Sequence, residues 1–272
     1  MSNEKYYADS DMRSIVRPLF IQKKEDPFSH TANSENASVF FFRLENHVYA
    51  CTCKHVIKTA NSFENVYLKK ESKTLRLKYP IKPSSSAISN NGFHFAYSED
   101  DSNIDLAFLC IKGTLLEAIE ESHYTILELD ETEPNIENFS NFYAYGWSHD
   151  EKTETMKEVK TPLIRCNFLP SNLSHYPYDY KLSFHADLKT EHNLYLSGMS
   201  GGLILGCLES SEKLVPVGII YQGAPTKKGA DEKQDTFLNM SNSIHILGYK
   251  ISSKFLKMCL KNYDISYFSE ET

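Results

Sequence analysis

The sequence lacks an apolar segment long enough to cross a membrane as a helix, and its first residues contain no apolar stretch of the kind found in signal peptides. An apolar run such as residues 39–42 is far too short to span a bilayer. We therefore expect a protein that does not bind membranes and is located in the cytoplasm. Secretion as an effector by a route without a classical signal peptide is the alternative.

The spacing typical of a disulfide framework is also missing. The six cysteines lie inside apolar segments and are not bounded by short loops. They are Cys51, Cys53, Cys110, Cys166, Cys207 and Cys259. This pattern predicts reduced thiols, which agrees with a cytoplasmic protein.

An excess of positive charge is absent as well. The chain has 29 Lys and Arg residues against 36 Asp and Glu residues, for a formal net charge of −7. This balance argues against nucleic acid as the main partner, because phosphate backbones are bound by basic surfaces. The basic stretch at residues 69–82 has no aromatic residues interleaved on its basic face and is predicted to be a solvated hairpin.

What the sequence does contain is a succession of short strand patterns. The 272 residues, 41% of them hydrophobic, suffice to bury a sizeable core. An acidic segment with Pro134, residues 128–141, is the expected connector between two β-rich halves, and helices are predicted at residues 114–122 and 251–260. Strands are predicted at residues 18–20, 37–42, 48–52, 66–68, 74–81, 104–111, 142–147, 159–168, 180–184, 202–208 and 214–222.

A serine between glycines precedes one of these strands, in the segment Gly-Met-Ser-Gly-Gly at residues 198–202. Such a segment alone is more often only a turn. In a functional interpretation, the glycines allow a sharp bend that points the amides of Gly198 and Ser200 at one spot. Paired amide donors of this kind stabilise the oxyanion of a tetrahedral intermediate. Serine is a weak nucleophile, so this interpretation also requires a base.

His55 and Asp105 are the residues that supply the base and its partner. His55 follows a predicted strand, where a turn is expected to start, and Asp105 is a lone acid at the head of an apolar strand. A carboxylate in such a place needs a strong partner, because an unpaired buried charge is costly. The Nδ1–H of an imidazole is such a partner, and the bond leaves Nε2 free to act as the base. We therefore predict His55, Asp105 and Ser200 as catalytic residues.

Four segments together resemble the chymotrypsin clan of trypsin-like serine peptidases, closest to bacterial cytoplasmic and HtrA-like peptidase domains. They are Thr-x-x-His-Val at residues 52–56, Asp-Leu-Ala at 105–107, Tyr-Gly-Trp at 145–147 and Gly-x-Ser-Gly-Gly at 198–202. The order His, Asp, Ser along the chain is also that of the clan. The resemblance covers about residues 36–250.

The resemblance implies an all-β fold of two six-stranded Greek-key β-barrels with a C-terminal helix. Residues 13–127 would form the first barrel and carry His55 and Asp105. Residues 140–262 would form the second barrel, with Ser200 and the helix. The implied function is a serine endopeptidase that hydrolyses polypeptide substrates through an acyl-enzyme, with the Gly198 and Ser200 amides as the oxyanion hole and with no metal or organic cofactor.

Substrate-binding positions and one departure also follow from this resemblance. The digestive enzymes of the clan have Asp before the nucleophile, which pairs with a newly cut N-terminus, and this chain has Met199. Activation by that route is therefore not expected. Leu194 falls at the floor of the specificity pocket and predicts a small or medium apolar residue before the cleaved bond. The backbone of Tyr221, Gln222 and Gly223 would border the cleft and pair with substrate as an added strand.

Two alternatives compete with this interpretation. Cys51, Cys53 and His55, with His47, have donor atoms that suit zinc, but no second pair of ligands with metal-site spacing follows, so core thiols are the better interpretation. The other alternative is a catalytically silent scaffold that keeps the fold as a binding module. The presence of all three triad residues favours the enzyme. Because no zymogen mechanism is apparent, we expect an activating or regulatory protein partner.

Overall fold

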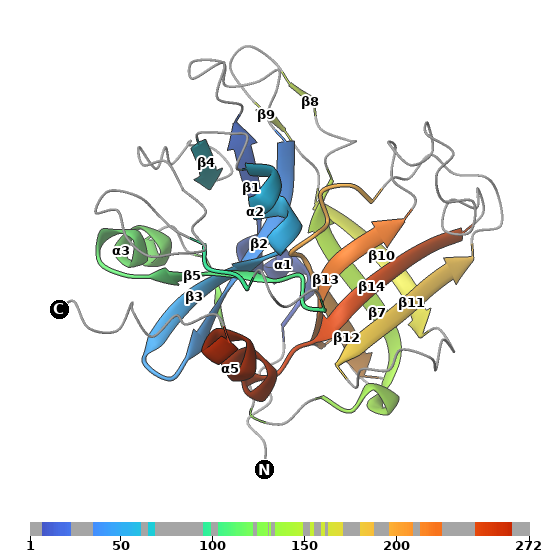
Figure 1. The fold of residues 1–272 in the computed structure, drawn as a ribbon. Coiled ribbons are helices and arrows are strands. Elements are labelled where there is room, and N and C mark those ends of the chain that lie inside the picture. Colours follow the sequence, from blue (N-terminus) through green and yellow to red (C-terminus); the bar gives the residue numbers. More distant parts are fainter. Residues whose placement is uncertain are drawn as a thin grey trace.

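The structure is a computed structural model of the chain. It describes residues 7–22, 35–60, 65–68, 95–98, 103–121, 124–129, 131, 134–148, 153–154, 159–160, 163–170, 180–187, 196–208, 213–224 and 243–262. These residues are mostly β-structure, arranged as one open sheet and one closed barrel beside it (Figure 1).

The open sheet is built from the first half of the chain. Its strands lie in the order β4-β1-β2-β3-β5, and β6 pairs with β2 in parallel. The bounds are β1 Val16–Gln22, β2 Glu35–Leu44, β3 His47–Thr52, β4 Asn65–Leu68, β5 Ala107–Ile111 and β6 Ile126–Glu128. β2 carries an apolar run at residues 39–42 because it is buried on both faces. Phe40 and Phe42 pack toward the barrel, and Val39 and Phe41 pack on the opposite face.

The closed barrel is built from the second half of the chain. Its strands close in the order β10-β11-β14-β13-β12-β7, and every neighbouring pair is antiparallel. The bounds are β7 Phe139–Trp147, β10 Leu163–Pro170, β11 Lys181–Asp187, β12 Leu203–Leu208, β13 Leu214–Ala224 and β14 Ser243–Lys250. A separate two-stranded sheet joins β8 Thr153–Glu154 to β9 Val159–Lys160.

The helices are short and lie around these sheets. They are η1 Asp9–Asp11, α1 Met12–Ile15, α2 Lys54–Ala60, α3 Thr114–Glu121, η2 Ile136–Asn138 and α5 Ser253–Asn262. α5 begins where the Ser252 hydroxyl accepts a hydrogen bond from the Phe255 amide at 3.1 Å. No helix in the described parts of the chain is both long and apolar enough to cross a membrane.

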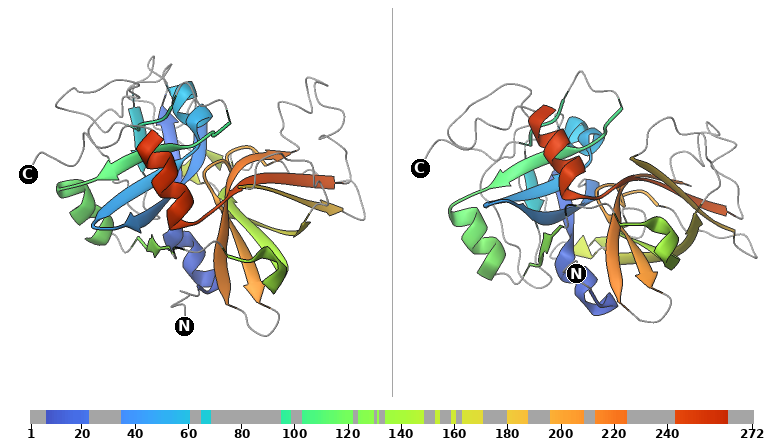
Figure 2. Two further views of the ribbon diagram at one scale, coloured as in Figure 1. Left: turned by 60° about the horizontal axis from the view of Figure 1, so that its bottom comes forward. Right: turned by 90° about the horizontal axis from the view of Figure 1, so that it is seen from below.

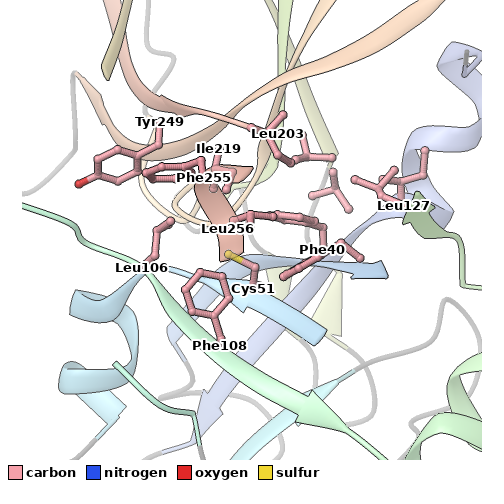
Figure 3. Close-up of a cluster of buried hydrophobic side chains, with 14 of the residues drawn as sticks. Phe40, Cys51, Leu106, Phe108, Leu127, Leu203, Ile219, Tyr249, Phe255 and Leu256 are labelled. Atoms are coloured by element: carbon pink, nitrogen blue, oxygen red, sulfur yellow. The ribbon is translucent and has the colours of Figure 1, made fainter. Parts of the chain in front are cut away.

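A large apolar cluster fills the space between the open sheet and the barrel. α5 follows the barrel strand β14 but lies across the open sheet (Figures 1 and 2), and its Phe255 and Leu256 join this cluster. Figure 3 shows these side chains together with Leu106 and Phe108 from the first half. Burial of apolar surface contributes about 25 cal/mol per Å², so the cluster holds the two halves in one arrangement.

The observed elements confirm part of the expected fold. The second half does form a closed six-stranded barrel, and the predicted C-terminal helix corresponds to α5. The first half differs, because its described strands form an open sheet and not the closed barrel expected. The predicted strand at residues 74–81 lies outside the described residues. The predicted strand at 104–111 is shorter than expected, since β5 starts at Ala107 and leaves Asp105 in the preceding loop.

Candidate active site

His55 and Asp105 lie together at the junction of β3, α2 and the loop before β5. The Nδ1 atom of His55 makes a short contact with Oδ2 of Asp105. The backbone N–H of His55 also donates to Oδ1 of the same carboxylate, at 2.9 Å. The His55 side chain is half exposed, and that of Asp105 is about one quarter exposed. The contact with Asp105 is made through Nδ1 and fixes the orientation of the imidazole ring.

The same carboxylate explains why a helix starts at this point. A turn was expected after β3, but α2 begins at Lys54. The first amides of a helix have no partners within the helix. Asp105 supplies them, because its carbonyl oxygen accepts from the Lys54 amide at 3.2 Å and its carboxylate accepts from the His55 amide. The capping residue comes from another part of the chain, so the local sequence did not reveal it.

Ser200 lies in residues 196–202, which we call the serine turn. Two backbone hydrogen bonds define it: the Met199 amide donates to the Leu196 carbonyl at 3.3 Å, and the Gly202 amide donates to the Met199 carbonyl at 2.8 Å. Gly198 and Gly201 occupy the third position of these two turns, with φ of 89° and 84°. Positive φ at the third position is the signature of type II turns and favours glycine. The glycines around Ser200 are therefore required by the backbone.

The amides of residues 198–202 in the serine turn fall into two groups, those that donate to a carbonyl and those that do not. The N–H groups of Met199, Gly201 and Gly202 are engaged in backbone hydrogen bonds. Within the described residues, the N–H groups of Gly198 and Ser200 donate to no acceptor. These are the two amides predicted to form the oxyanion hole.

The serine turn packs against β2 and against the end of β3, the strand that leads into His55. The Ser38 amide donates to the Ser200 carbonyl at 2.9 Å, and the Thr52 hydroxyl donates to the Ser38 carbonyl at 2.8 Å. Gly201 lies so close to this strand that an added Cβ would be 2.6 Å from Thr52 Oγ1. The carbonyl of Ile220 accepts both from the Gly201 amide, at 2.8 Å, and from the thiol of Cys53, at 3.3 Å. Residues from both halves of the chain therefore meet at one place.

Met199 is fully buried in the apolar core of the barrel. A Cβ added to Gly146 would lie 2.8 Å from both Cα and Cβ of Met199, so Met199 occupies the space that a side chain at position 146 would need. A carboxylate at position 199 would need a cationic partner inside the core. The apolar side chain instead anchors the serine turn by packing.

The predicted substrate-binding residues fall into two groups. Tyr221, Gln222 and Gly223 are part of β13, and the Ser200 hydroxyl lies 3.5 Å from the Tyr221 carbonyl oxygen. Gln222 and Gly223 pair with β14 on one side, while the ladder to β12 ends at Ile219. Leu194 lies outside the described residues.

The donor atoms of Cys53, His55 and Asp105 lie within 4.8 Å of one another, which is a grouping that a metal ion could use. Each of these atoms already has a protein partner: the imidazole and the carboxylate contact each other, and the thiol donates to Ile220. Burial raises the pKa of the Cys53 thiol well above its ordinary value, and the Asp105 charge raises it further. Zinc binds thiolates, so a metal bound here would have to displace this proton. Cys51, also considered as a ligand, is likewise buried, and burial raises its pKa.

Two residues with a clear place in this site were missed by the sequence analysis. The Ser38 hydroxyl donates to the Gly198 carbonyl at 3.0 Å and accepts from the Trp147 amide at 2.8 Å. The Tyr249 hydroxyl accepts from the Asp105 amide at 2.9 Å and donates to the Asn103 carbonyl at 3.0 Å. Both act across more than 100 residues of sequence, and no local motif marks either one.

No protein-family model and no curated protein matches the chain. Among solved structures it is similar to a thermostable serine protease, AL20, from an extremophilic microorganism, with 14% identity, coverage of 97% of this chain and 100% of that one, and a TM-score of 0.47. The protease Anisep from Arthrobacter nicotinovorans gives 10% identity, coverage of 95% and 99%, and a TM-score of 0.45. The scabies mite inactivated protease paralogue S-I1 is 10% identical, with coverage of 94% of this chain and 98% of that one, and a TM-score of 0.49. Because these scores lie below 0.5, the function has to be inferred from this chain's own residues.

Proposed function

We propose that this chain is a serine endopeptidase that cleaves polypeptides through Ser200, His55 and Asp105. The observation that carries the proposal is the His55–Asp105 pair, which orients a partly exposed imidazole, together with a glycine-rich turn that bears a serine and packs on Thr52 of the strand before His55. Such a constellation is recognised by geometry and roles and not by sequence position.

In the proposed reaction, the Ser200 hydroxyl attacks the carbonyl carbon of the peptide bond. His55 takes the hydroxyl proton at Nε2 and afterwards donates it to the leaving amine. Asp105 keeps the Nδ1–H in place and stabilises the imidazolium without becoming protonated. The Gly198 and Ser200 amides stabilise the oxyanion, and loss of one such donor costs about 3 kcal/mol in the barrier. Water then releases the acyl group by the same steps.

The substrate is proposed to add its backbone beside β13, at Tyr221, Gln222 and Gly223, as an extra strand. This part of β13 is next to the serine turn. A Cβ added to Gly223 would lie 2.8 Å from Cβ of Leu196, the first residue of that turn. An apolar pocket floor at Leu194 would favour a small or medium apolar residue before the cleaved bond. Dominant cleavage of a peptide library after Arg or Lys would contradict this preference.

Regulation by a protein partner is part of the proposal. Met199 stands where a carboxylate would be needed to pair with a cut N-terminus, so activation by cleavage of the N-terminus is not proposed. Activity must then be restrained in another way. The partner would be recognised by its effect on turnover. High turnover of generic peptides by the purified chain alone would argue against it.

The test is covalent labelling with a fluorophosphonate probe, which reacts with activated serines. Wild type should be labelled at Ser200, and Ser200→Ala and His55→Ala should not be, because one lacks the nucleophile and the other the base. Ser140→Ala is the matched control, since it removes a hydroxyl from β7 whose bond goes to the Cys207 carbonyl. Failure to label wild type, with candidate partners present, would favour the silent scaffold.

A further inference from the structure

Tyr249 joins the two halves of the molecule at Asp105. It belongs to β14 of the closed barrel, whereas Asp105 precedes β5 of the open sheet. Its hydroxyl accepts a hydrogen bond from the Asp105 amide at 2.9 Å and donates one to the Asn103 carbonyl at 3.0 Å. One hydroxyl group therefore bridges both ends of the short segment 103–105.

The Tyr249 ring is held firmly enough to make this bridge a fixed point. The residue is 1% exposed. Its ring stacks on that of Tyr221 at 4.5 Å between centroids, and on that of Phe255 at 6.0 Å. Figure 3 shows Tyr249 beside Phe255, in the same apolar cluster as Leu106, the residue that follows Asp105. Burial raises the pKa of the Tyr249 hydroxyl, so the group keeps the proton that it donates.

Asp105 has a partner at each of its polar groups, and Tyr249 provides the one that comes from the barrel. The carboxylate contacts His55 at the ring and at the backbone amide. The carbonyl accepts from the Lys54 amide at 3.2 Å. These three partners lie on α2, in the same half as Asp105. The Tyr249 hydroxyl is the contact that sets Asp105 relative to the barrel, which carries Ser200.

We propose that Tyr249 is the positioning residue for Asp105, and through it for His55, relative to the serine turn. The effect on rate rests on the proposed peptidase function, whereas the effect on the His55–Asp105 pair does not. Without the hydroxyl, the Asp105 amide loses its acceptor and segment 103–105 loses its hydrogen bonds to the barrel, so the carboxylate can shift relative to His55 and to the serine turn. A less well placed carboxylate stabilises the imidazolium less.

The experiment compares Tyr249→Phe with wild type and with Tyr145→Phe. Tyr249→Phe keeps the stacked ring and removes the hydroxyl. Tyr145 is also a buried tyrosine of the barrel, and its hydroxyl bonds to Asp9, away from the site. In Tyr249→Phe, kcat should fall by about 10- to 100-fold with KM little changed, because misplacement by about 1 Å has that effect. The acidic limb of the kcat/KM profile should move to lower pH, and Tyr145→Phe should alter neither.

A second measurement does not depend on activity. The His55 ring is titrated by NMR in wild type and both variants, and its midpoint should fall in Tyr249→Phe only. A midpoint and kcat equal to wild type in a folded Tyr249→Phe would overturn the proposal. A lowered midpoint in a chain that no fluorophosphonate labels would support Tyr249 as the positioning residue and reject the peptidase function. If Tyr249→Phe does not fold, Phe255→Leu, which keeps the hydroxyl but loosens its ring, should lower the midpoint by a smaller amount, and no shift there would contradict the proposal.

Discussion

The His55–Asp105 pair and the serine turn differ in what holds them in place. Asp105 is held by hydrogen bonds to partners on α2 and β14, one of which is the Tyr249 side chain. The serine turn is held by its own backbone, with two glycines at positive φ and with turn hydrogen bonds between amides and carbonyls. The proposed acid–base pair therefore depends on hydrogen bonds to side chains, whereas the turn that carries the proposed nucleophile depends on two glycines that have positive φ.

Because of this difference, we expect substitutions in the two regions to affect different properties of the protein. Isosteric changes in the acid–base pair should reduce catalysis and leave the fold intact, because packing is unchanged. Addition of a methyl group at Gly201 or Gly202 of the serine turn should reduce stability as well, because an added Cβ there would clash with neighbouring backbone atoms. The following changes test this contrast from the largest expected effect to the smallest.

Asp105→Asn should give the largest loss, about 10⁴-fold in kcat, with little change in the free energy of unfolding. An amide cannot accept from both the His55 amide and Nδ1–H, so the imidazole is held in the wrong tautomer. The measurement is steady-state kinetics together with denaturant unfolding. Asp9→Asn is the control, because it changes a carboxylate that bonds to Tyr145 and lies apart from His55. Equal kcat in Asp105→Asn and wild type would contradict the assignment of Asp105.

Gly201→Ala should destabilise the protein by about 3–5 kcal/mol, which combines the cost of positive φ with a steric clash. An added Cβ would lie 2.1 Å from the Ser38 carbonyl oxygen. Gly113→Ala is the matched control, with φ of 55° and no atom within 4 Å of the added Cβ. It should cost about 1–2 kcal/mol. Equal losses of unfolding free energy in the two variants would show that the close packing of the serine turn is not limiting.

Ser38→Ala should cost about 1–3 kcal/mol, since it takes away the acceptor of the Trp147 amide and the donor to the Gly198 carbonyl. It should also lower kcat, because Gly198 carries one of the proposed oxyanion donors. Denaturant unfolding and kinetics on one preparation measure both effects. A loss of stability with unchanged kcat would separate Ser38 from the orientation of the serine turn.

Alkaline pH should produce the smallest effect. Burial raises the pKa of the Cys166 thiol on β10 to about 12 from its ordinary 9.0. The unfolded chain then loses this proton near pH 9 while the folded chain keeps it. Stability from this thiol is full below pH 9 and falls by about 1.4 kcal/mol per pH unit above it. Cys166→Ala, in the barrel, and Cys53→Ala, beside Asp105, should each make unfolding free energy less dependent on pH between 9 and 10. Unchanged slopes would contradict the burial effect.

Much of the candidate site could be predicted because its residues lie in short local patterns. His55, Asp105 and Ser200 each stand next to a strand, with small or apolar neighbours that restrict how the chain can turn. Gly198 and Gly201 are needed wherever two type II turns follow each other. The strands of the barrel and α5 could also be expected, because alternation and amphipathicity are local properties, whereas closure of the barrel was implied by the resemblance.

The remainder depends on contacts between distant parts of the chain. α2 was not expected because its cap is Asp105, and β14 was not expected although its pairing with β13 and β11 is extensive. The roles of Ser38 and Tyr249 could not be predicted for the same reason. A hydroxyl group has no preferred partner in the sequence, and only packing decides which amide or carbonyl lies within its reach.

The sequence by itself determined which groups are available for chemistry: an imidazole, a carboxylate and a serine between glycines, in the order typical of one peptidase clan. Residue type decides proton affinity, nucleophilicity and backbone freedom, and these need no tertiary contact. Only the tertiary structure decided that the pair is formed, that the serine turn packs on the strand before His55, and that a barrel tyrosine holds Asp105. Hydrogen bonds act over about 3 Å, so such relations exist only after the apolar core has brought the two halves together.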